Sequence, residues 1–388
     1  MKRYHPLIAA AVGTIAALIF AHGRSTPYNN YVLLADAILH GRLFIDLHWV
    51  DKHIDAVLWH GHRYIVNDPI PALFMLPLVA LFGLDANQTT LACFFCGAAC
   101  AAAWMILERL ELKFEPRMWL AIVFLVGTDL LWTAMLGDVW FIAQTAAVAF
   151  LSLMLAEVLG KNRSWLVIVL FALAVGCRFT IVMALPVVLL WTYSGLLQAQ
   201  RAPRALVIAC ATLVPFVALW VSYNLARWGV PWDSGHTIFY HQDEDVGSLA
   251  GSPFAFGNVP DQLYSFFVQA PSVQPAYPYL VPAMEGVALT WTSPILVFAA
   301  WARARPAAIV SLWVATVLVA GPSFLYYVNG ASQFGMRHAL DFEPFLFVLL
   351  GIAATRTWPL WAVVLAFWSS SVGLWGIWYW NEFYRATY

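Results

Sequence analysis

The segment RSTPYNNYVLLADAILHGRLFIDLHWVDKHIDAVLWHGHRYIVND, residues 24–68, is the one long polar interruption near the start of an otherwise apolar sequence. Apolar runs lie on both sides of it, at residues 7–20 and 69–84. Ionisable side chains are costly inside a membrane, so this segment needs water or a substrate around it. We therefore interpret it as an active-site loop. Its aspartates and histidines are Asp36, Asp46, Asp51, Asp55, Asp68, His40, His48, His53, His60 and His62.

The composition predicts an all-α polytopic membrane protein. Of the 388 residues, 62% are hydrophobic and only 11% are charged, whereas roughly 25% are charged in an average soluble domain. The net charge of −1 argues against nucleic acid as a partner, because there is no basic excess to neutralise phosphates.

The two apolar runs beside the polar segment differ in what they predict. Residues 7–20 follow Met1-Lys2-Arg3 and are expected to form a retained first span that begins in the cytoplasm; a cleaved signal peptide ending near Gly23 is the alternative. Residues 69–84 contain Pro77 and would extend only about 24 Å as a helix, short of the roughly 30 Å hydrocarbon core. We expect this second run to lie on the membrane surface.

The distribution of basic residues fixes the predicted topology. About 11 spans are expected (10–13), with the N-terminus inside, the C-terminus outside and two interfacial helices in the first outer loop. If residues 69–84 crossed the membrane, every later connection would change sides, and most basic residues would move outside, against the positive-inside rule. After the first span, spans are expected near 87–107, 118–136, 139–158, 164–177, 181–198, 205–225, 284–302, 306–328, 343–355 and 358–380. The cytoplasmic basic residues are then Lys2, Arg3, Arg109, Lys113, Arg117, Lys161, Arg163, Arg201, Arg204, Arg303, Arg305 and Arg356.

A single membrane domain, residues 1–388, is expected. It comprises the first span (1–23), an outer loop with the interfacial helices (24–86), central spans (87–225), a long outer loop (226–283) and C-terminal spans (284–388). The first interfacial helix is predicted over residues 30–40, because its apolar residues form one stripe suited to a membrane surface. This stripe is Tyr31, Leu34, Ala35, Ile38 and Leu39.

Several short motifs, taken in order, resemble a known family. Tyr28-Asn29-Asn30-Tyr31 and the following Leu34-Ala35-Asp36-Ala37 look like the first outer loop of membrane-embedded glycosyltransferases. The resemblance is to enzymes of the protein O-mannosyltransferase and aminoarabinose-transferase type, which are family 39-like and have the GT-C fold. Further motifs similar to that family are Tyr64-Ile65-Val66-Asn67-Asp68-Pro69, Gly137-Asp138-Val139-Trp140, Gly176-Cys177-Arg178-Phe179-Thr180 and Gly335-Met336-Arg337-His338.

The resemblance implies an inverting transfer of a sugar from a polyprenyl-phosphate carrier to a lipid, glycan or protein acceptor. It places the protein in the bacterial plasma membrane, as part of cell-envelope synthesis, with the active site facing the periplasm. No cofactor is certain. A divalent cation, Mg²⁺ or Mn²⁺, held by Asp138 and Asp68 is left open.

Attack on an anomeric carbon needs a carboxylate that accepts the proton of the acceptor, and cations near the departing phosphate. The predicted catalytic residues are Asp138, Asp68, Asp55 and Asp36. The family usually has an acid just after the first span, whereas residues 24–31 contain only Asn29 and Asn30. Either Asp36, Asp46, Asp51 or Asp55 takes its place, or the activity is altered or lost. The predicted substrate-binding residues are Tyr31, Asn30, Tyr64, Arg178, Arg337, His338 and Trp232.

Each candidate also has a purely structural interpretation. Asp138 and Asp68 each precede an expected helix and are plausible N-caps. Arg178 is at a span end, where arginines extend toward the interface. Arg337 and His338 have potential ion-pair partners nearby in the sequence, Asp341 and Glu343.

Other polar and sulfur-containing residues favour structural roles. The spacing of His48, His53, His60 and His62 is too irregular to favour a transition-metal site. Cys93, Cys96 and Cys100 lie among small residues, a pattern that favours a close helix contact over a metal site. Asp129 is expected to face the interior of the helix bundle.

Two other classes of function remain open. A transporter or flippase needs polar residues along a route through the membrane, and usually an internal repeat. A non-catalytic scaffold of the cell envelope would explain the missing acid. The clustering of Asp, His and Arg on the outer side favours the enzyme.

Overall fold

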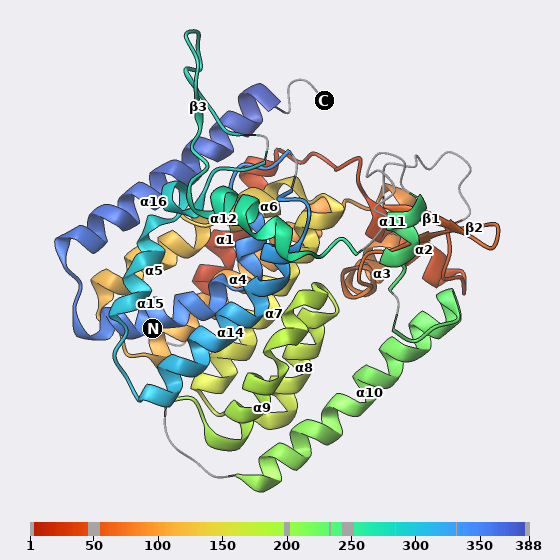
Figure 1. Ribbon diagram of the computed structural model, residues 1–388, viewed down its shortest axis with the longest axis horizontal. Helices are drawn as coiled ribbons and strands as arrows, with labels where there is room; N and C mark the ends of the chain where they lie inside the picture. Colours follow the sequence, from red (N-terminus) through yellow and green to blue (C-terminus); the bar gives the residue numbers. More distant parts are fainter. Residues whose placement is uncertain are drawn as a thin grey trace.

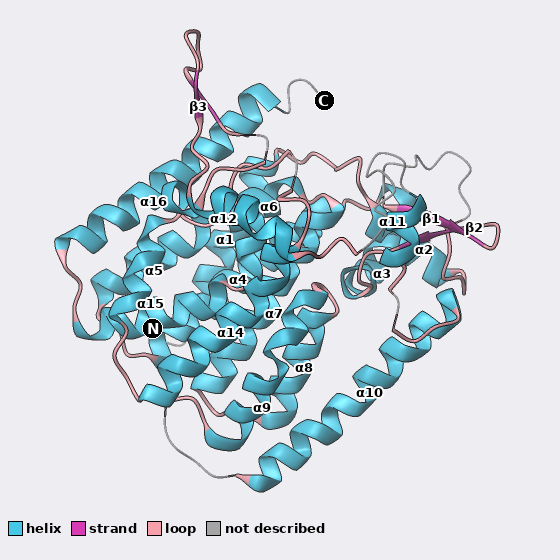
Figure 2. Ribbon diagram, in the orientation of Figure 1, coloured by secondary structure: helices cyan, strands magenta, loops and turns pink. Residues whose placement is uncertain are grey.

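The computed structural model describes residues 4–45, 55–197, 202–232, 234–242, 252–283, 285–330 and 332–384. Helices dominate it, and two short two-stranded sheets lie at the periphery (Figure 2). The α-helices are α1 (His5–Ala21), α2 (Asn30–Leu39), α3 (Ile70–Phe82), α4 (Gln88–Arg109), α5 (Phe114–Val126), α6 (Leu130–Leu136), α7 (Val139–Leu159), α8 (Ser164–Val175), α9 (Leu185–Ser194), α10 (Pro203–Trp228), α11 (His236–Gln242), α12 (Val259–Phe267), α13 (Leu289–Thr292), α14 (Pro306–Leu325), α15 (Glu343–Arg356) and α16 (Leu360–Tyr379).

The shorter elements connect these helices. The strands are β1 (Ala56–Trp59), which pairs antiparallel with β2 (His62–Ile65), and β3 (Ser272–Val273), which pairs antiparallel with β4 (Leu280–Val281). The remaining turns are η2 (Gly83–Asp85), η3 (Phe179–Ala184), η4 (Phe256–Asn258), η5 (Pro294–Trp301), η6 (Arg337–Asp341) and η7 (Trp380–Tyr384).

The centre of the molecule is a stack of helices in which α4 packs on α1 and α7, and α7 packs on α8 (Figure 1). Small residues allow the closest approach. A Cβ added to Gly97 would come within 2.6 Å of the Ala10 carbonyl oxygen, and one added to Gly13 would meet the Cys100 sulfur at 2.7 Å. The predicted close helix contact at the cysteine-rich stretch is therefore confirmed.

Six helical segments in the described part of the chain are long and apolar enough to cross a membrane. Several other predicted spans are shorter than expected: α8 covers 12 residues and α9 covers 10. The total of about 11 spans therefore remains a prediction. The six segments are α4, α5 with α6, α7, α10, α14, and α16 with η7.

Two of the predicted spans are interrupted. The span expected at 118–136 breaks between α5 and α6, and the span expected at 284–302 begins only at Leu289 and breaks at Ser293. Pro294 cannot donate a backbone hydrogen bond, which explains the second break. The two breaks meet, because the Ser293 hydroxyl donates to the Gly127 carbonyl at 2.7 Å.

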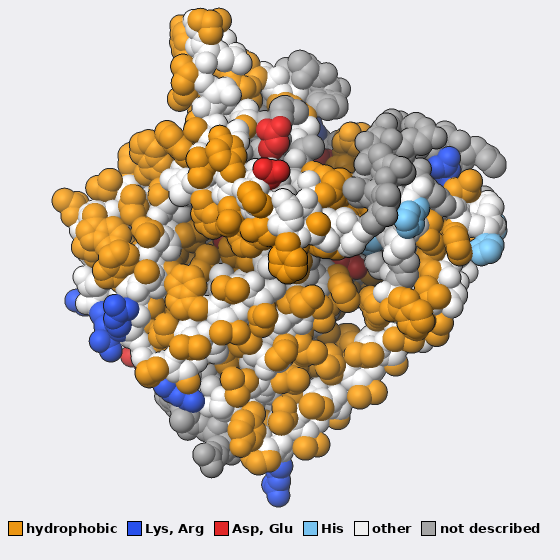
Figure 3. Space-filling model, viewed as in Figure 1, with side chains coloured by type: hydrophobic (Ala, Val, Ile, Leu, Met, Phe, Trp, Pro, Cys, Tyr) orange, Lys and Arg blue, Asp and Glu red, His pale blue; other side chains and the backbone are white. Residues whose placement is uncertain are grey.

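Helix α10 lies along one edge of the bundle (Figure 1). Only 6% of its most apolar stretch is buried, so most of its apolar surface is available to lipid. Figure 3 shows a face covered mainly by apolar side chains, with most of the visible Lys and Arg at its lower rim.

The first outer loop contains the two predicted short helices, α2 and α3, with the β1–β2 hairpin between them. Helix α2 begins at Asn30 as predicted and ends at Leu39. The expected amphipathic stripe is wrong: Val32 and Leu33 are buried like Tyr31, while Leu39 is 46% exposed. Because α2 packs against α3 and is held by α4, most of its surface is buried in protein.

The segment predicted as the long outer loop, 226–283, contains several secondary-structure elements in its described residues. Helix α10 continues to Trp228, and the loop then contains α11, α12 and the β3–β4 pair. Helix α12 packs against α14 and α13, and its Gln262 side chain donates to the Tyr326 carbonyl at 2.9 Å. This contact places α12 over the segment that follows α14.

Candidate functional site

The side-chain amide of Gln88 joins the first outer loop to the start of α7. Gln88 is completely buried; its Nε2 donates to the Tyr28 carbonyl at 3.2 Å and to the Gly137 carbonyl at 2.7 Å. Its Oε1 accepts from the Tyr31 backbone N–H at 3.1 Å. Sequence reasoning missed Gln88, although an amide at the start of an apolar span is a usable signal, since buried polar groups need partners.

The Gly137-Asp138 turn positions one predicted catalytic carboxylate. Gly137 has φ +68°, and a Cβ there would lie 2.4 Å from the Thr89 Cα, so the position requires glycine. Asp138 precedes α7, but its side chain makes no capping bond to the helix. Instead its Oδ1 accepts a hydrogen bond from the Thr26 hydroxyl. Thr26 lies in the segment where the family resemblance implied an acid.

A second carboxylate reaches the same turn of α7. Asp55 accepts a hydrogen bond from the Trp140 indole N–H, with 2.5 Å between Nε1 and Oδ2. The Trp140 ring is 5.2 Å from the Tyr28 ring. Among the acids offered in place of the missing one, Asp55 is therefore brought to the N-terminal turn of α7. Asp36 pairs with His40 at 3.5 Å, and Asp46 and Asp51 lie outside the described residues.

The predicted Arg178 forms the strongest ion pair of the site. Its Nε lies 3.1 Å from Asp341 Oδ1 and its Nη2 lies 2.9 Å from Asp341 Oδ2, a two-point contact. The Thr180 hydroxyl donates to the same carboxylate at 2.9 Å. Burial opposes the charge on Arg178, but Asp341 outweighs it, and the pKa of Arg178 rises above its ordinary value.

His338 lies beside this pair. Arg178 Nη2 lies 3.3 Å from His338 Nδ1. Burial, and then the positive charges of Arg337 and Arg178, lower the pKa of His338 well below its ordinary value. These effects favour a neutral imidazole, and the role of His338 in substrate binding stays a prediction. In this geometry Nδ1 accepts from Arg178.

Arg337 is held by amides. Its Nε donates to Gln333 Oε1 at 2.9 Å, and its Nη1 donates to Gln144 Oε1 at 3.3 Å. The side chain is 8% exposed, and no carboxylate of the described residues lies within 4.0 Å of it. Its suggested pairing with Asp341 or Glu343 is therefore wrong. Burial, and next the charge of Arg178, lower the pKa of Arg337 to about 10, so it remains charged at pH 7.

Asp68 and Tyr31 lie near Arg178. Asp68 does not cap α3; its Oδ2 accepts from the Phe179 backbone N–H at 3.1 Å. Burial raises the pKa of Asp68 to about 6, against the opposing effect of Arg178. Burial and then the charge of Asp68 raise the pKa of Tyr31. The Tyr31 hydroxyl is buried and has no hydrogen-bond partner among the described residues.

Three other candidates are placed differently. Asn30 donates to Asn67 Oδ1 at 3.3 Å, next to Asp68 in the chain. Tyr64 packs on Trp228 with 5.1 Å between ring centroids, in a small apolar cluster under the hairpin. Trp232 is 77% exposed after the end of α10. Asn30 is thus brought to the chain neighbour of Asp68, and Tyr64 pairs with Val57 on the strand that follows Asp55.

The residues considered as metal ligands do not form a cluster in the part of the chain that the structure describes. Among the described residues, no three His, Cys, Asp or Glu side chains come together to hold a metal ion. His62 stacks on Phe44 with 3.9 Å between centroids, while His48 and His53 lie outside the described residues. The interior placement of Asp129 is confirmed, since it is 6% exposed.

Comparisons with known proteins place few limits on this chain. No family model matches the sequence, and no curated protein matches it. Among solved structures, it is similar to the Archaeoglobus fulgidus oligosaccharyltransferase in the apo form, with a TM-score of 0.47 and 12% sequence identity. The match covers 97% of this chain and 56% of that one, so this chain spans little more than half of its length.

Proposed function

We propose that this protein is an inverting membrane glycosyltransferase that moves a sugar from a polyprenyl-phosphate carrier to an acceptor hydroxyl at the outer face. The observation that carries the proposal is Arg337, a buried charged guanidinium that, among the described residues, is hydrogen-bonded through its side chain to neutral amides and lies over the Phe141 ring at 5.2 Å. A buried cation without a carboxylate partner is costly, and an anionic ligand removes that cost. Gln144, which accepts from Arg337, lies on α7, the helix that begins directly after Asp138, so the cation and a predicted catalytic carboxylate are linked through one helix.

The reaction assigns these groups complementary roles. The Asp138 carboxylate accepts the proton of the acceptor hydroxyl, with Asp68 as the second candidate, while the hydroxyl oxygen forms the new bond to the anomeric carbon. The bond from that carbon to the phosphate oxygen breaks, and the electron pair leaves with the polyprenyl phosphate. Arg337 stabilises the negative charge that develops there.

Release of free polyprenyl phosphate from a panel of lipid-linked sugars tests the proposal. Wild type is compared with Asp138→Asn and Asp68→Asn, with Asp85→Asn as a control because Asp85 is an exposed acid of η2. We expect turnover in wild type and Asp85→Asn, and its loss in Asp138→Asn without a change in thermal unfolding. A folded wild type that turns over no donor would favour a transporter or a scaffold.

The metal requirement is a separate proposal. Asp138 accepts from Thr26 and Asp68 from Phe179, and the described residues contain no group of three or more metal ligands, so no reaction step is assigned to a metal. The same assay in EDTA, followed by addition of Mg²⁺ or Mn²⁺, tests it. Loss and recovery of turnover would support a divalent cation on these carboxylates, and unchanged turnover would contradict it.

A further inference from the structure

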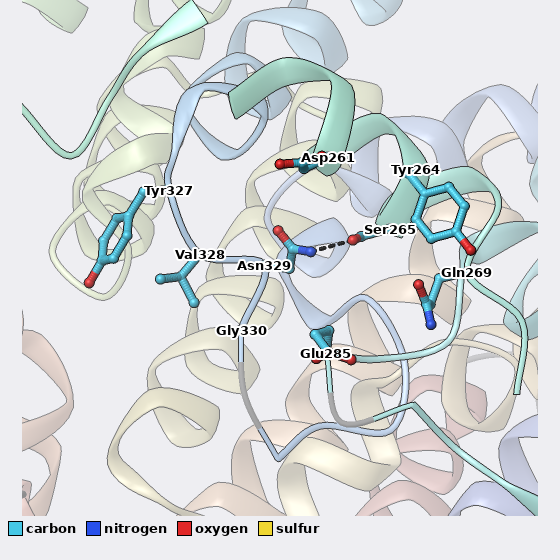
Figure 4. A pocket seen from close by; sticks show the side chains of 9 residues that line it. All are labelled: Asp261, Tyr264, Ser265, Gln269, Glu285, Tyr327, Val328, Asn329 and Gly330. Carbon is cyan, nitrogen blue, oxygen red and sulfur yellow. Dashed lines mark hydrogen bonds between the residues drawn. The ribbon is translucent and has the colours of Figure 1, made fainter. Parts of the chain in front are cut away.

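A cavity of about 430 Å³ opens between α12 and the segment after α14. This volume lies within the usual range of small-molecule sites. Figure 4 shows Asp261, Tyr264 and Ser265 on α12, with Asn329 and Glu285 below them. All its lining residues except Val328 and Gly330 carry a polar side-chain group. The cavity is therefore suited to a polar ligand.

The charge of this cavity distinguishes it from the arginine-containing site. Its described lining contains two carboxylates, Asp261 and Glu285, and no Lys, Arg or His. Neither carboxylate has a basic partner within 4.0 Å among the described residues. Such a lining repels phosphate and carboxylate ligands. It favours groups that donate hydrogen bonds, such as sugar hydroxyls and amines.

The polar groups of the cavity include both acceptors and donors of the hydrogen bonds by which a sugar is bound. Carboxylates accept hydrogen bonds from hydroxyls, and the amides of Gln269 and Asn329 have both donor and acceptor atoms. The Asn329 amide already contacts the Ser265 hydroxyl, which fixes its orientation. Tyr264 is 52% exposed at the cavity and presents an apolar ring face together with a hydroxyl.

Gln333 connects this cavity to Arg337. It is completely buried, and its Nε2 donates to the Glu285 carbonyl at 2.5 Å and to the Asn329 carbonyl at 3.0 Å. Its Oε1 accepts from Arg337 Nε at 2.9 Å. One side chain therefore holds two backbone segments of the cavity and the guanidinium of the site.

Two consecutive tyrosines form a second connection. Tyr327 lines the cavity. The hydroxyl of Tyr326 lies 2.5 Å from that of Tyr240, and the charges of Asp55 and Arg178 act on Tyr326. The cavity and the arginine-containing site are thus adjacent parts of one outer region.

We propose that the cavity between α12 and Asn329 binds the acceptor as a non-acidic saccharide, while the donor phosphate binds at Arg337. The role of the saccharide as the acceptor rests on the proposed function, whereas the presence of a saccharide-binding site does not. The two substrates then bind at different places because of their charge. The anionic carrier binds at Arg337, and the hydroxyl-rich acceptor binds in the cavity, whose described lining contains no cation.

The test is direct binding in the absence of any lipid donor. The protein is placed in lipid nanodiscs, because sugar-headed detergents would compete for the cavity. Affinities are measured for cellobiose, for the glucosamine disaccharide and for a disaccharide that carries a glucuronate. We expect the first two to bind and the glucuronate compound to bind at least about tenfold more weakly, because of like-charge repulsion.

The double variant Asp261→Asn/Glu285→Gln keeps the shape and removes both charges. It should weaken the binding of the glucosamine disaccharide by about tenfold or more, and it should abolish the discrimination against the glucuronate compound. The affinities of Asp85→Asn should match those of wild type. Binding of no disaccharide, equal binding of the glucuronate compound to wild type, or unchanged affinities in a folded double variant would each overturn the proposal. Saccharide binding without turnover of any lipid-linked donor would instead reject the glycosyltransferase and retain the saccharide site.

Discussion

Arg178 and Arg337 both lie close to His338, yet they have different hydrogen-bond partners. Arg178 makes a two-point contact with Asp341, at 2.9 Å for the shorter approach. Arg337 is bound by the amides of Gln333 and Gln144 and has no carboxylate within 4.0 Å in the described chain. Asp341 raises the pKa of the first arginine, whereas burial lowers that of the second to about 10.

The difference separates a structural cation from one that is available to a ligand. A guanidinium already paired with a carboxylate gains little from a further anion, since its charge is compensated. Amides orient the guanidinium of Arg337 without neutralising it, so a phosphate there gains the full charge-assisted contact. The sequence motifs that contain the two arginines do not reveal this difference.

The largest effect is expected at the paired arginine. Asp341→Asn leaves Arg178 without its carboxylate and should lower the free energy of unfolding by about 3 kcal/mol or more, as for a broken buried pair. Denaturant unfolding of the purified protein measures it. Arg178→Met/Asp341→Leu should recover much of the loss, because no unpaired charge remains. A stability of Asp341→Asn within about 0.5 kcal/mol of wild type would contradict the assignment.

At the amide-bound arginine, activity should change more than stability. Arg337→Gln should reduce turnover of the lipid-linked donor about 10²- to 10³-fold, the usual effect of losing one donor to a developing oxyanion. Its unfolding free energy should stay near that of wild type or rise, since an unpaired buried charge is removed. Full turnover in Arg337→Gln would contradict the proposal that Arg337, unlike Arg178, binds the donor phosphate.

The carboxylate near Arg178 should make stability depend on pH. The pKa of Asp68 is about 6 in the folded state against an ordinary 3.8, so the folded protein binds more protons than the unfolded chain between these values. The contribution of Asp68 to stability should fall by on the order of 2 kcal/mol as pH rises from about 4 to about 6, and be constant above. Thermal unfolding across this range should show the dependence in wild type and not in Asp68→Asn. A difference in stability between wild type and Asp68→Asn that does not change with pH would contradict the raised pKa of Asp68.

The smallest effect is expected at one of the amides that holds Arg337. Gln144→Met removes the acceptor of a 3.3 Å contact and should lower the free energy of unfolding by about 1.5 kcal/mol. Turnover should fall modestly because the guanidinium is less well oriented. Denaturant unfolding and the donor assay measure the two effects, and a loss of turnover as large as that in Arg337→Gln would show that Gln144 does more than orient.

The apolar runs predicted helix positions well and helix interruptions poorly. The predicted span at 139–158 nearly coincides with α7 (Val139–Leu159), since apolar length alone decides such a helix. The break at Gly127 was missed; there the carbonyl accepts a hydrogen bond from Ser293, 166 positions away in the chain. Local hydropathy does not contain such contacts.

The same limit applies to the site. Motifs indicated Asp138, Asp68 and Arg178, which lie at helix starts or turns where polar residues stand out. Gln88 and Gln333 were missed, and Asp341 was assigned to Arg337 or His338 instead of Arg178, because these roles depend on which distant groups the side chains contact. The lowered pKa of His338 could not be foreseen either, because it depends on burial and on Arg178, which is 160 positions away in the chain.

The most direct test of the account is the affinity of the protein in nanodiscs for a polyprenyl phosphate against the matching polyprenol. Wild type should bind the phosphate at least about tenfold more tightly, a difference of about 1.4 kcal/mol. Arg337→Gln should lose that preference while retaining the Arg178–Asp341 pair and the wild-type unfolding transition. Equal affinity for the two lipids in wild type, or an unchanged preference in Arg337→Gln, would contradict the central claim that Arg337 binds the donor phosphate.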